Sequence, residues 1–232
     1  MSIAEQVARV RERIEGAADG RRVWLVAATK MNGPEAVREA VAAGVDACGE
    51  NRVQEFLEKD ALGAYAGAPK HFIGHLQRNK VNKLVGRVDL IQSVDSAELL
   101  ELIDRRARAL GVVQDVLIEI SIAGEAQKSG VSPADLPALL ETAGALGALR
   151  VRGLMCVPPI LGPGGSNRRY FAEMRQLFID NGGKKYDNVS MDLLSMGMTD
   201  EYPEALAEGA NMVRGGTGIF GARPYPTAEE QP

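Results

Sequence analysis

Short apolar segments alternate with helical segments along almost the whole chain, and this alternation most constrains the fold. The apolar segments span residues 23–28, 46–49, 70–73, 89–94, 115–122, 151–157, 191–194 and 211–214. Helical segments lie between them, such as the one from Ser96 to Leu110, which Gly111 ends. Eight strand–helix repeats over about 220 residues predict an α/β fold, a single (β/α)8 TIM barrel. A doubly wound open sheet is the alternative.

Composition indicates one globular domain. The chain has 232 residues, of which 45% are hydrophobic and 25% charged, as in ordinary globular proteins. No long linker divides it, so we expect one barrel domain over residues 1–223, followed by a mobile Pro- and Glu-rich tail at 224–232. The net charge of −4 argues against a general nucleic-acid partner. No apolar run approaches the roughly 20 residues of a membrane span.

Cysteine usage and the N-terminal residues indicate a cytoplasmic location. The chain has two cysteines, Cys48 and Cys156, whose separation does not match a metal site, and we expect both to be small buried residues. Residues 2–15 are charged and helical in pattern, unlike a signal peptide. These features predict a reduced cytoplasmic protein with no bound metal.

Lys30 lies just after the first apolar segment. In a (β/α)8 barrel the active site is built where strands end and the following loops begin. A lysine buried there is costly unless its amine is neutral or covalently bound. The functional interpretation is a lysine that forms a Schiff base. The alternative is a side chain that merely reaches solvent.

Two glycine-containing loops follow the seventh and eighth strands. They are Ser195-Met196-Gly197 and Gly215-Gly216-Thr217, at the corner where such barrels frequently bind phosphate. Their backbone amides and hydroxyls suit a phosphate, although the glycines could serve tight turns alone. A lysine and a phosphate site on one face suggest a phosphorylated aldehyde. Pyridoxal 5′-phosphate (PLP) is the first candidate, and a Schiff-base aldolase acting on a sugar phosphate is another.

Arg214 and Asn51 also follow strands. Arg214 either makes a surface ion pair or directs its guanidinium at a ligand ring, where it would donate to an unprotonated pyridine nitrogen. Asn51 either bonds a ligand hydroxyl or caps the next helix. His71 and His75 would share one side of a strand, and no acid–base partner is visible for either. The cluster Arg78, Lys80 and Lys83 is interpreted as a solvated helix face.

Seven motifs together carry a resemblance to a known family. They are LVAATK followed by GENRVQEF, HFIGHLQRNK, the segment around KSGV, RGLMCVPP, LSMGMTDEYPEAL and MVRGGTGIFGAR. They run in order from near residue 23 to residue 223, so the resemblance covers almost the whole chain. The chain is similar to the pyridoxal phosphate homeostasis proteins, also called the YggS-like family. Met31-Asn32-Gly33 and the Gly- and Pro-rich loop 158–167 depart from the family pattern.

The resemblance implies the barrel of the alanine racemase N-terminal domain and a PLP site within it. Lys30 matches the lysine that forms the aldimine. The resemblance places the remaining groups as follows: Ser195 and the amides of Gly216 and Thr217 at the phosphate, Arg214 at the pyridine nitrogen, Asn51 near the ring and Met155 against the cofactor.

The resemblance further implies a non-catalytic protein that buffers PLP and delivers it, with apo PLP enzymes as partners. A PLP-dependent amino-acid racemase is the alternative. Racemases of this fold draw a second base from an additional β-domain and a partner subunit, and the chain ends about nine residues after Arg223. We therefore expect a carrier, and a monomer.

Overall fold

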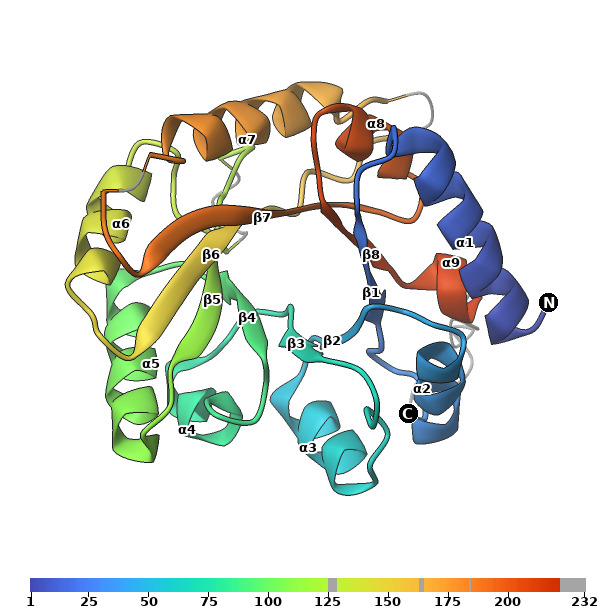
Figure 1. The fold of residues 1–232 in the computed structure, drawn as a ribbon, viewed down its shortest axis with the longest axis horizontal. Coiled ribbons are helices and arrows are strands. Elements are labelled where there is room, and N and C mark those ends of the chain that lie inside the picture. The colour runs from blue at the N-terminus through green and yellow to red at the C-terminus, as the bar shows by residue number, and fades with distance from the viewer. Residues whose placement is uncertain (125–128, 163–164, 184, 222–232) are drawn as a thin grey trace, which may run out of the picture.

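The computed structural model describes residues 1–124, 129–162, 165–183 and 185–221. Within these residues, eight parallel strands form one closed barrel in sequence order, and β8 pairs with β1. Helices surround the strands on the outside (Figure 1). The predicted (β/α)8 barrel is confirmed, and the open-sheet alternative is wrong. The predicted tail at 224–232, and the domain boundary before it, lie outside the described residues.

The strands follow the predicted segments closely. Their bounds are β1 (Trp24–Ala28), β2 (Ala47–Glu50), β3 (Lys70–Phe72), β4 (Leu90–Val94), β5 (Gln114–Glu119), β6 (Leu149–Met155), β7 (Val189–Met198) and β8 (Met212–Gly215). The fifth strand ends three residues earlier than predicted, at Glu119. The seventh is longer than predicted at both ends.

Helices connect the strands. Their bounds are α1 (Ile3–Ala17), α2 (Pro34–Ala42), α3 (Val53–Ala61), the 3-10 turn η1 (Arg78–Lys80), α4 (Val81–Leu84), α5 (Ala97–Leu110), α6 (Leu136–Gly144), α7 (Arg168–Asp180), α8 (Tyr202–Ala207) and α9 (Thr217–Phe220). The short α9 was not predicted, because its residues read as a glycine loop. No helix of the described residues has the length and apolar character to cross a membrane.

Apolar side chains form two layers. Along β1, Leu25 and Ala27 join the large layer between strands and helices, whereas Val26 joins a small inner cluster with residues such as Leu117 and Met212. This alternation is the period of two expected of a strand. Strands such as β1, β2, β4 and β8 are covered on both faces, which explains why they read as continuous apolar runs.

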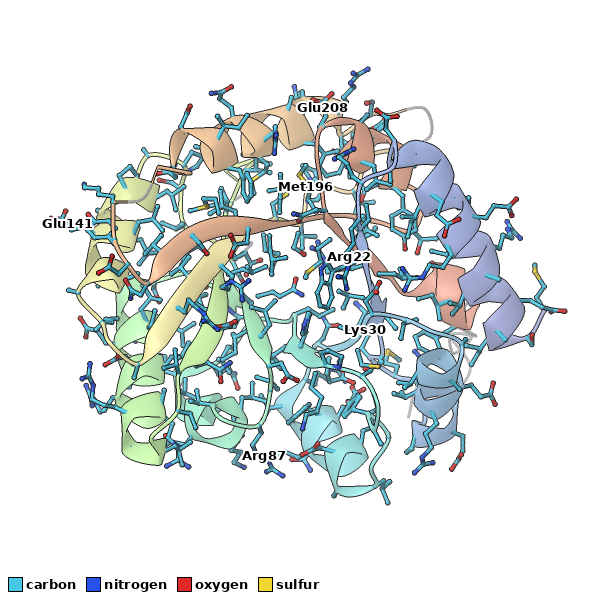
Figure 2. All side chains as sticks on the ribbon, viewed as in Figure 1. Arg22, Lys30, Arg87, Glu141, Met196 and Glu208 are labelled. Carbon is cyan, nitrogen blue, oxygen red and sulfur yellow. The ribbon has the colours of Figure 1, made fainter. Side chains whose placement is uncertain are left out.

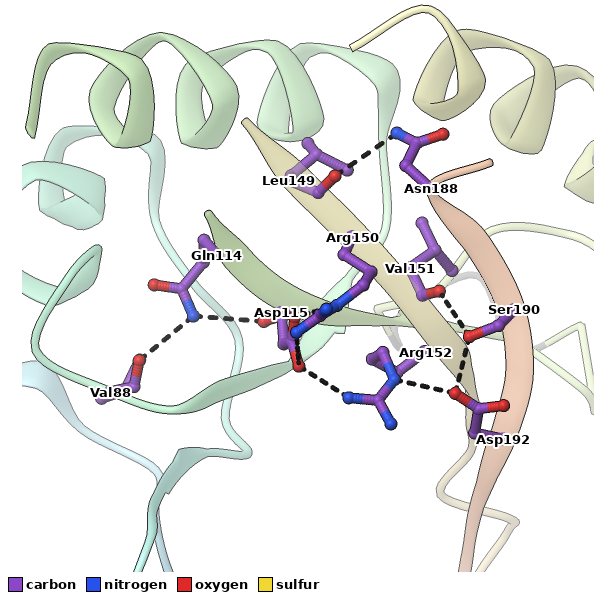
Figure 3. A network of polar contacts seen from close by, with 10 residues as sticks. All are labelled: Val88, Gln114, Asp115, Leu149, Arg150, Val151, Arg152, Asn188, Ser190 and Asp192. Carbon is purple, nitrogen blue, oxygen red and sulfur yellow. Dashed lines mark hydrogen bonds and ion pairs between the residues drawn. The ribbon is translucent and has the colours of Figure 1, made fainter. Parts of the chain in front are cut away.

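An ion network joins β5, β6 and β7 at the end of the barrel away from Lys30 (Figure 3). Asp115 accepts from Arg150 at 2.7 Å and from Arg152 at 2.8 Å, and Arg152 also donates to Asp192 at 2.9 Å. Because one carboxylate serves two guanidinium groups, the network fixes neighbouring strands at this end. The polar groups discussed below lie at the opposite end.

Candidate functional site

Lys30 leaves the barrel beside the loop that follows β8. In the pairing of β1 with β8, Val26 lies opposite Arg214 and Ala27 opposite Gly215. A Cβ built on Gly216 would lie 3.8 Å from the Cβ of Ala28, so the two strand ends are in contact distance. Lys30 itself is partly buried, and Figure 2 shows it inside the ring of helices. The strand end that precedes the predicted lysine therefore lies beside the predicted phosphate loop.

Arg214 is buried inside the barrel and held by two hydrogen bonds. Its Nη1 donates to Ser195 Oγ at 2.6 Å and its Nη2 to the Cys156 carbonyl at 2.7 Å. Only 4% of the residue is exposed, so the interpretation as a surface ion pair is wrong. Burial lowers the pKa of Arg214, an effect that nearby Cys156 and Glu119 oppose. A guanidinium remains charged even so.

A directed chain of hydrogen bonds runs from Arg214 across the barrel. Because Arg214 can only donate, Ser195 Oγ accepts from it and donates its own proton to Gln92 Oε1 at 2.7 Å. The Gln92 amide therefore turns its nitrogen to His71 Nδ1, at 2.9 Å. His71 Nδ1 is then an acceptor, which assigns the ring proton to Nε2. Burial lowers the pKa of His71 to about 4.

Ser195 is fully buried, and its hydroxyl proton is engaged by Gln92. A phosphate oxygen would need that proton, so a phosphate contact requires the hydroxyl to turn away from Gln92. Its role at a phosphate stays a prediction. The structure does assign Ser195 one function directly, which is to hold Arg214.

Asn51 carries a buried acceptor without a protein partner. Its Oδ1 has no hydrogen bond within the described structure, and such an atom is costly to leave unpaired. The N-cap of α3 is Arg52, with no side-chain capping bond, so the prediction that Asn51 caps this helix is wrong. The free acceptor fits the alternative prediction, in which Asn51 meets a hydroxyl of a ligand.

The remaining predicted residues differ in their surroundings. Met155 is 1% exposed and packs in the inner cluster from β6. A Cβ on Gly215 would lie 2.7 Å from the Tyr202 hydroxyl, so close packing explains this glycine, whereas Gly216 has room. Thr217 is exposed and lines a pocket of about 260 Å³ next to α1. The backbone of Gly216 and Thr217, rather than the Thr217 side chain, is therefore the part that fits the predicted phosphate site.

Glu119 is a buried carboxyl group at the end of β5 that the sequence interpretation missed. It lies in register with Met155, which lies in register with Ser195. Burial raises the pKa of Glu119 to about 7, with a further upward contribution from Asp95 and an opposing one from Arg214. The predicted strand ran on to residue 122, so Glu119 lay inside it rather than at its end.

The other candidates take peripheral positions. His75 Nδ1 lies 3.6 Å from Asp95 Oδ2, and Arg78 pairs with Glu98 at 2.8 Å. Lys80 and Lys83 line a pocket of about 320 Å³ that also includes Asn51 and His75.

Both cysteines are buried, as predicted, and burial raises the pKa of each thiol to about 12. Among the described residues, the structure shows no cluster of side chains suited to a metal ion.

Comparisons with known proteins agree with this fold. Residues 1–224 match the model of the alanine racemase N-terminal domain family. The pyridoxal phosphate homeostasis protein of Aquifex aeolicus is 43% identical over 97% of this chain and 100% of its own length. The structure of PipY from Synechococcus elongatus, with PLP bound, is 35% identical over 95% of this chain and all of that chain, with a TM-score of 0.83.

A more distant likeness shows the shared barrel. Alanine racemase of Clostridium difficile in complex with cycloserine is 15% identical, with a TM-score of 0.72, covering 97% of this chain and 61% of the racemase. The Aquifex aeolicus protein matches this chain over its full length and at much higher identity than the racemase does. The chain therefore belongs to the pyridoxal phosphate homeostasis protein family, which has the alanine racemase N-terminal-domain fold.

Proposed function

We propose that this protein binds PLP as a Schiff base on Lys30 and acts in intracellular PLP homeostasis, as a buffer and donor of the cofactor. PLP supplies an aldehyde, and the neutral lysine amine adds to its carbon. A carbon–nitrogen double bond forms and the aldehyde oxygen leaves as water, so the step needs no oxidant. The names of the relatives and the PLP bound to PipY support this proposal.

One observation carries the proposal: a fixed, buried guanidinium lies on the strand next to the one that Lys30 follows. Val26 on β1 is opposite Arg214 on β8, and two hydrogen bonds hold the guanidinium in place. In this proposal Arg214 donates to the pyridine nitrogen. The unpaired Oδ1 of Asn51 accepts from the ring hydroxyl.

The other predicted residues complete the proposed site. The amides of Gly216 and Thr217 hold the phosphate, with Ser195 as an additional donor when it releases Gln92. Met155 packs against the cofactor from β6. Each of these placements is a proposal that rests on the positions described above.

We propose a carrier rather than an enzyme. A charged guanidinium at the pyridine nitrogen leaves that nitrogen without a proton, which weakens the ring as an electron sink. The alternative is an amino-acid racemase, and the raised pKa of Glu119 favours it. A pKa of about 7 suits a group that exchanges protons near neutrality. In the carrier proposal the protein is a cytoplasmic monomer that delivers PLP to apo enzymes.

Addition of PLP to the purified protein tests the proposal. A visible absorption band should appear, and Lys30→Ala should abolish it. Lys185→Ala is the matched control, since Lys185 contacts the Tyr186 ring in the loop before β7, at the other end of the barrel. A band that persists in Lys30→Ala would contradict the proposal. For delivery, the loaded protein should restore activity to an apo PLP enzyme.

A further inference from the structure

Both neighbours of Lys30 are tied to one group of charged side chains, in which Glu50 and Lys59 are buried and Glu55 is partly exposed. The backbone of Thr29 donates to Gly49 O at 2.8 Å, and its hydroxyl lies 3.0 Å from Glu50 Oε2. On the other side, the Met31 amide donates to Glu55 Oε2 at 2.7 Å. The segment that carries Lys30 is thus held before and after the lysine.

Lys59 connects these two anchors. Its Nζ donates to the Thr29 carbonyl at 2.8 Å, to Glu50 Oε2 at 2.6 Å and to Glu55 Oε2 at 3.3 Å. All three protons of the ammonium group therefore have acceptors. The side chain of Lys59 is 7% exposed and that of Glu50 is fully buried. Charges buried to this degree are stable only with such complete hydrogen bonding.

The backbone at Met31 shows that this anchoring holds a strained conformation. Met31 has a φ of +61°, in the left-handed region that a non-glycine residue rarely adopts. Strain of this kind persists where surrounding contacts enforce it, and it is concentrated at functional sites. Here the Glu55 bond to the Met31 amide supplies the contact. Burial would raise the pKa of Glu55, but the bonds from Met31 and Lys59 lower it overall.

We propose that Lys59, Glu50 and Glu55 are positioning residues that fix the backbone of Lys30, so that its amine meets the PLP aldehyde in a reactive geometry. This inference rests on the proposed function, because it assumes that PLP binds to Lys30. It assigns to these three residues no contact with the cofactor. They act through Thr29 and Met31. A buried ion network with a purely structural role would need no contact with both neighbours of the lysine.

Glu55→Ala tests the inference, with Glu58→Ala as the matched control. Both residues lie on α3, but Glu58 is exposed and bonds Gln54 instead of the lysine segment. Two ligands are compared: PLP, and pyridoxine 5′-phosphate, whose alcohol cannot form the carbon–nitrogen double bond. Glu55→Ala should weaken PLP binding and slow Schiff-base formation by about tenfold or more. Binding of pyridoxine 5′-phosphate should stay within about twofold.

The control and two further variants make the test specific. Glu58→Ala should leave both affinities unchanged. Glu55→Gln keeps an oxygen that can accept from the Met31 amide, and it should recover most of the PLP affinity. Thr29→Val removes the hydroxyl bond to Glu50 at nearly constant volume, and it should repeat the selective loss if Glu55→Ala does not fold.

Three outcomes would overturn the inference. They are unchanged PLP binding in both Glu55→Ala and Thr29→Val, an equal loss for the two ligands, or a loss as large in Glu58→Ala. Failure of the proposed function has a different signature, because Lys30→Ala would then bind PLP as well as the wild type does. The two failures are therefore distinguishable in one set of titrations.

Discussion

The guanidinium of Arg214 and the hydroxyl of Ser195 are 2.6 Å apart, both buried in the barrel. Since the arginine can only donate, this contact sets the direction of every later hydrogen bond in the chain to Gln92 and His71. A substitution at Ser195 therefore affects the position of Arg214 as well as any group bound near the serine.

Ser195→Ala should weaken PLP binding. Losing one charge-assisted hydrogen bond costs about 1.5–3 kcal/mol, which corresponds to a roughly 10- to 150-fold higher Kd. Equilibrium titration with PLP and with pyridoxal, which lacks the phosphate, measures the effect. If Ser195 contacts the phosphate, the loss should be larger for PLP. An equal loss for both ligands would assign Ser195 to the support of Arg214 alone.

A serine at the other end of the same strand provides the control for that comparison. Ser190 bonds Asp192 at 2.7 Å in the ion network of Figure 3. Ser190→Ala should leave both affinities unchanged.

Amino acids should not be racemised at an enzyme-like rate by the loaded protein. Arg214 supplies a permanent charge at the proposed position of the pyridine nitrogen, so the ring stabilises a carbanion poorly. Deuterium wash-in at the α-carbon of alanine, with chiral analysis, measures the rate. Exchange with inversion at the usual turnover of about 1–1000 per second, lost in Lys30→Ala, would favour a racemase over a carrier.

His71 should make the protein less stable in acid. Its pKa is about 4 when folded, against an ordinary 6.5. As pH falls below 6.5, the unfolded chain binds a proton that the folded chain does not, so stability is lost between about pH 6.5 and 4. At pH 4.5 the loss is about 2–3 kcal/mol. Urea unfolding at several pH values should show that the wild type loses this free energy of unfolding in acid and that His71→Gln does not. The same pH dependence in both proteins would contradict the prediction.

Glu119 should produce the opposite trend. Its folded pKa of about 7 lies above the ordinary 4.5, so its contribution is present at low pH and is lost as pH rises through about 7. Relative to the wild type, the free energy of unfolding of Glu119→Gln should rise by about 2–3 kcal/mol between pH 4.5 and 8. The same urea series measures this gain. A constant difference between wild type and variant over that range would rule out the raised pKa.

The sequence predicted the barrel because its strands are buried on both faces and so read as unbroken apolar runs. Strand ends were harder to predict. Ile120 and Ile122 are buried and continue the apolar run beyond β5, which hid Glu119. The polar residue Ser190 hid the start of β7, which begins two residues before the predicted segment.

The placement of Lys30 and Arg214 on one face was predictable, because barrel topology alone gathers strand ends there. The hydrogen-bond partners of the residues at this face were not predictable. Ser195 and Gln92 are 103 residues apart in sequence, and hydrogen bonds at such separations carry no local pattern. The sequence did not single out Lys59, because its contact with the Thr29 carbonyl arises only in the folded barrel.

The covalent attachment point of PLP tests the central claim most directly. Borohydride reduction of the PLP-loaded protein, followed by peptide mass analysis, locates the modified lysine. The account predicts the mass of the reduced cofactor on the peptide that carries Lys30, and unmodified protein in Lys30→Ala. Cofactor mass on a different lysine, or none on Lys30 in a fully loaded sample, would contradict it.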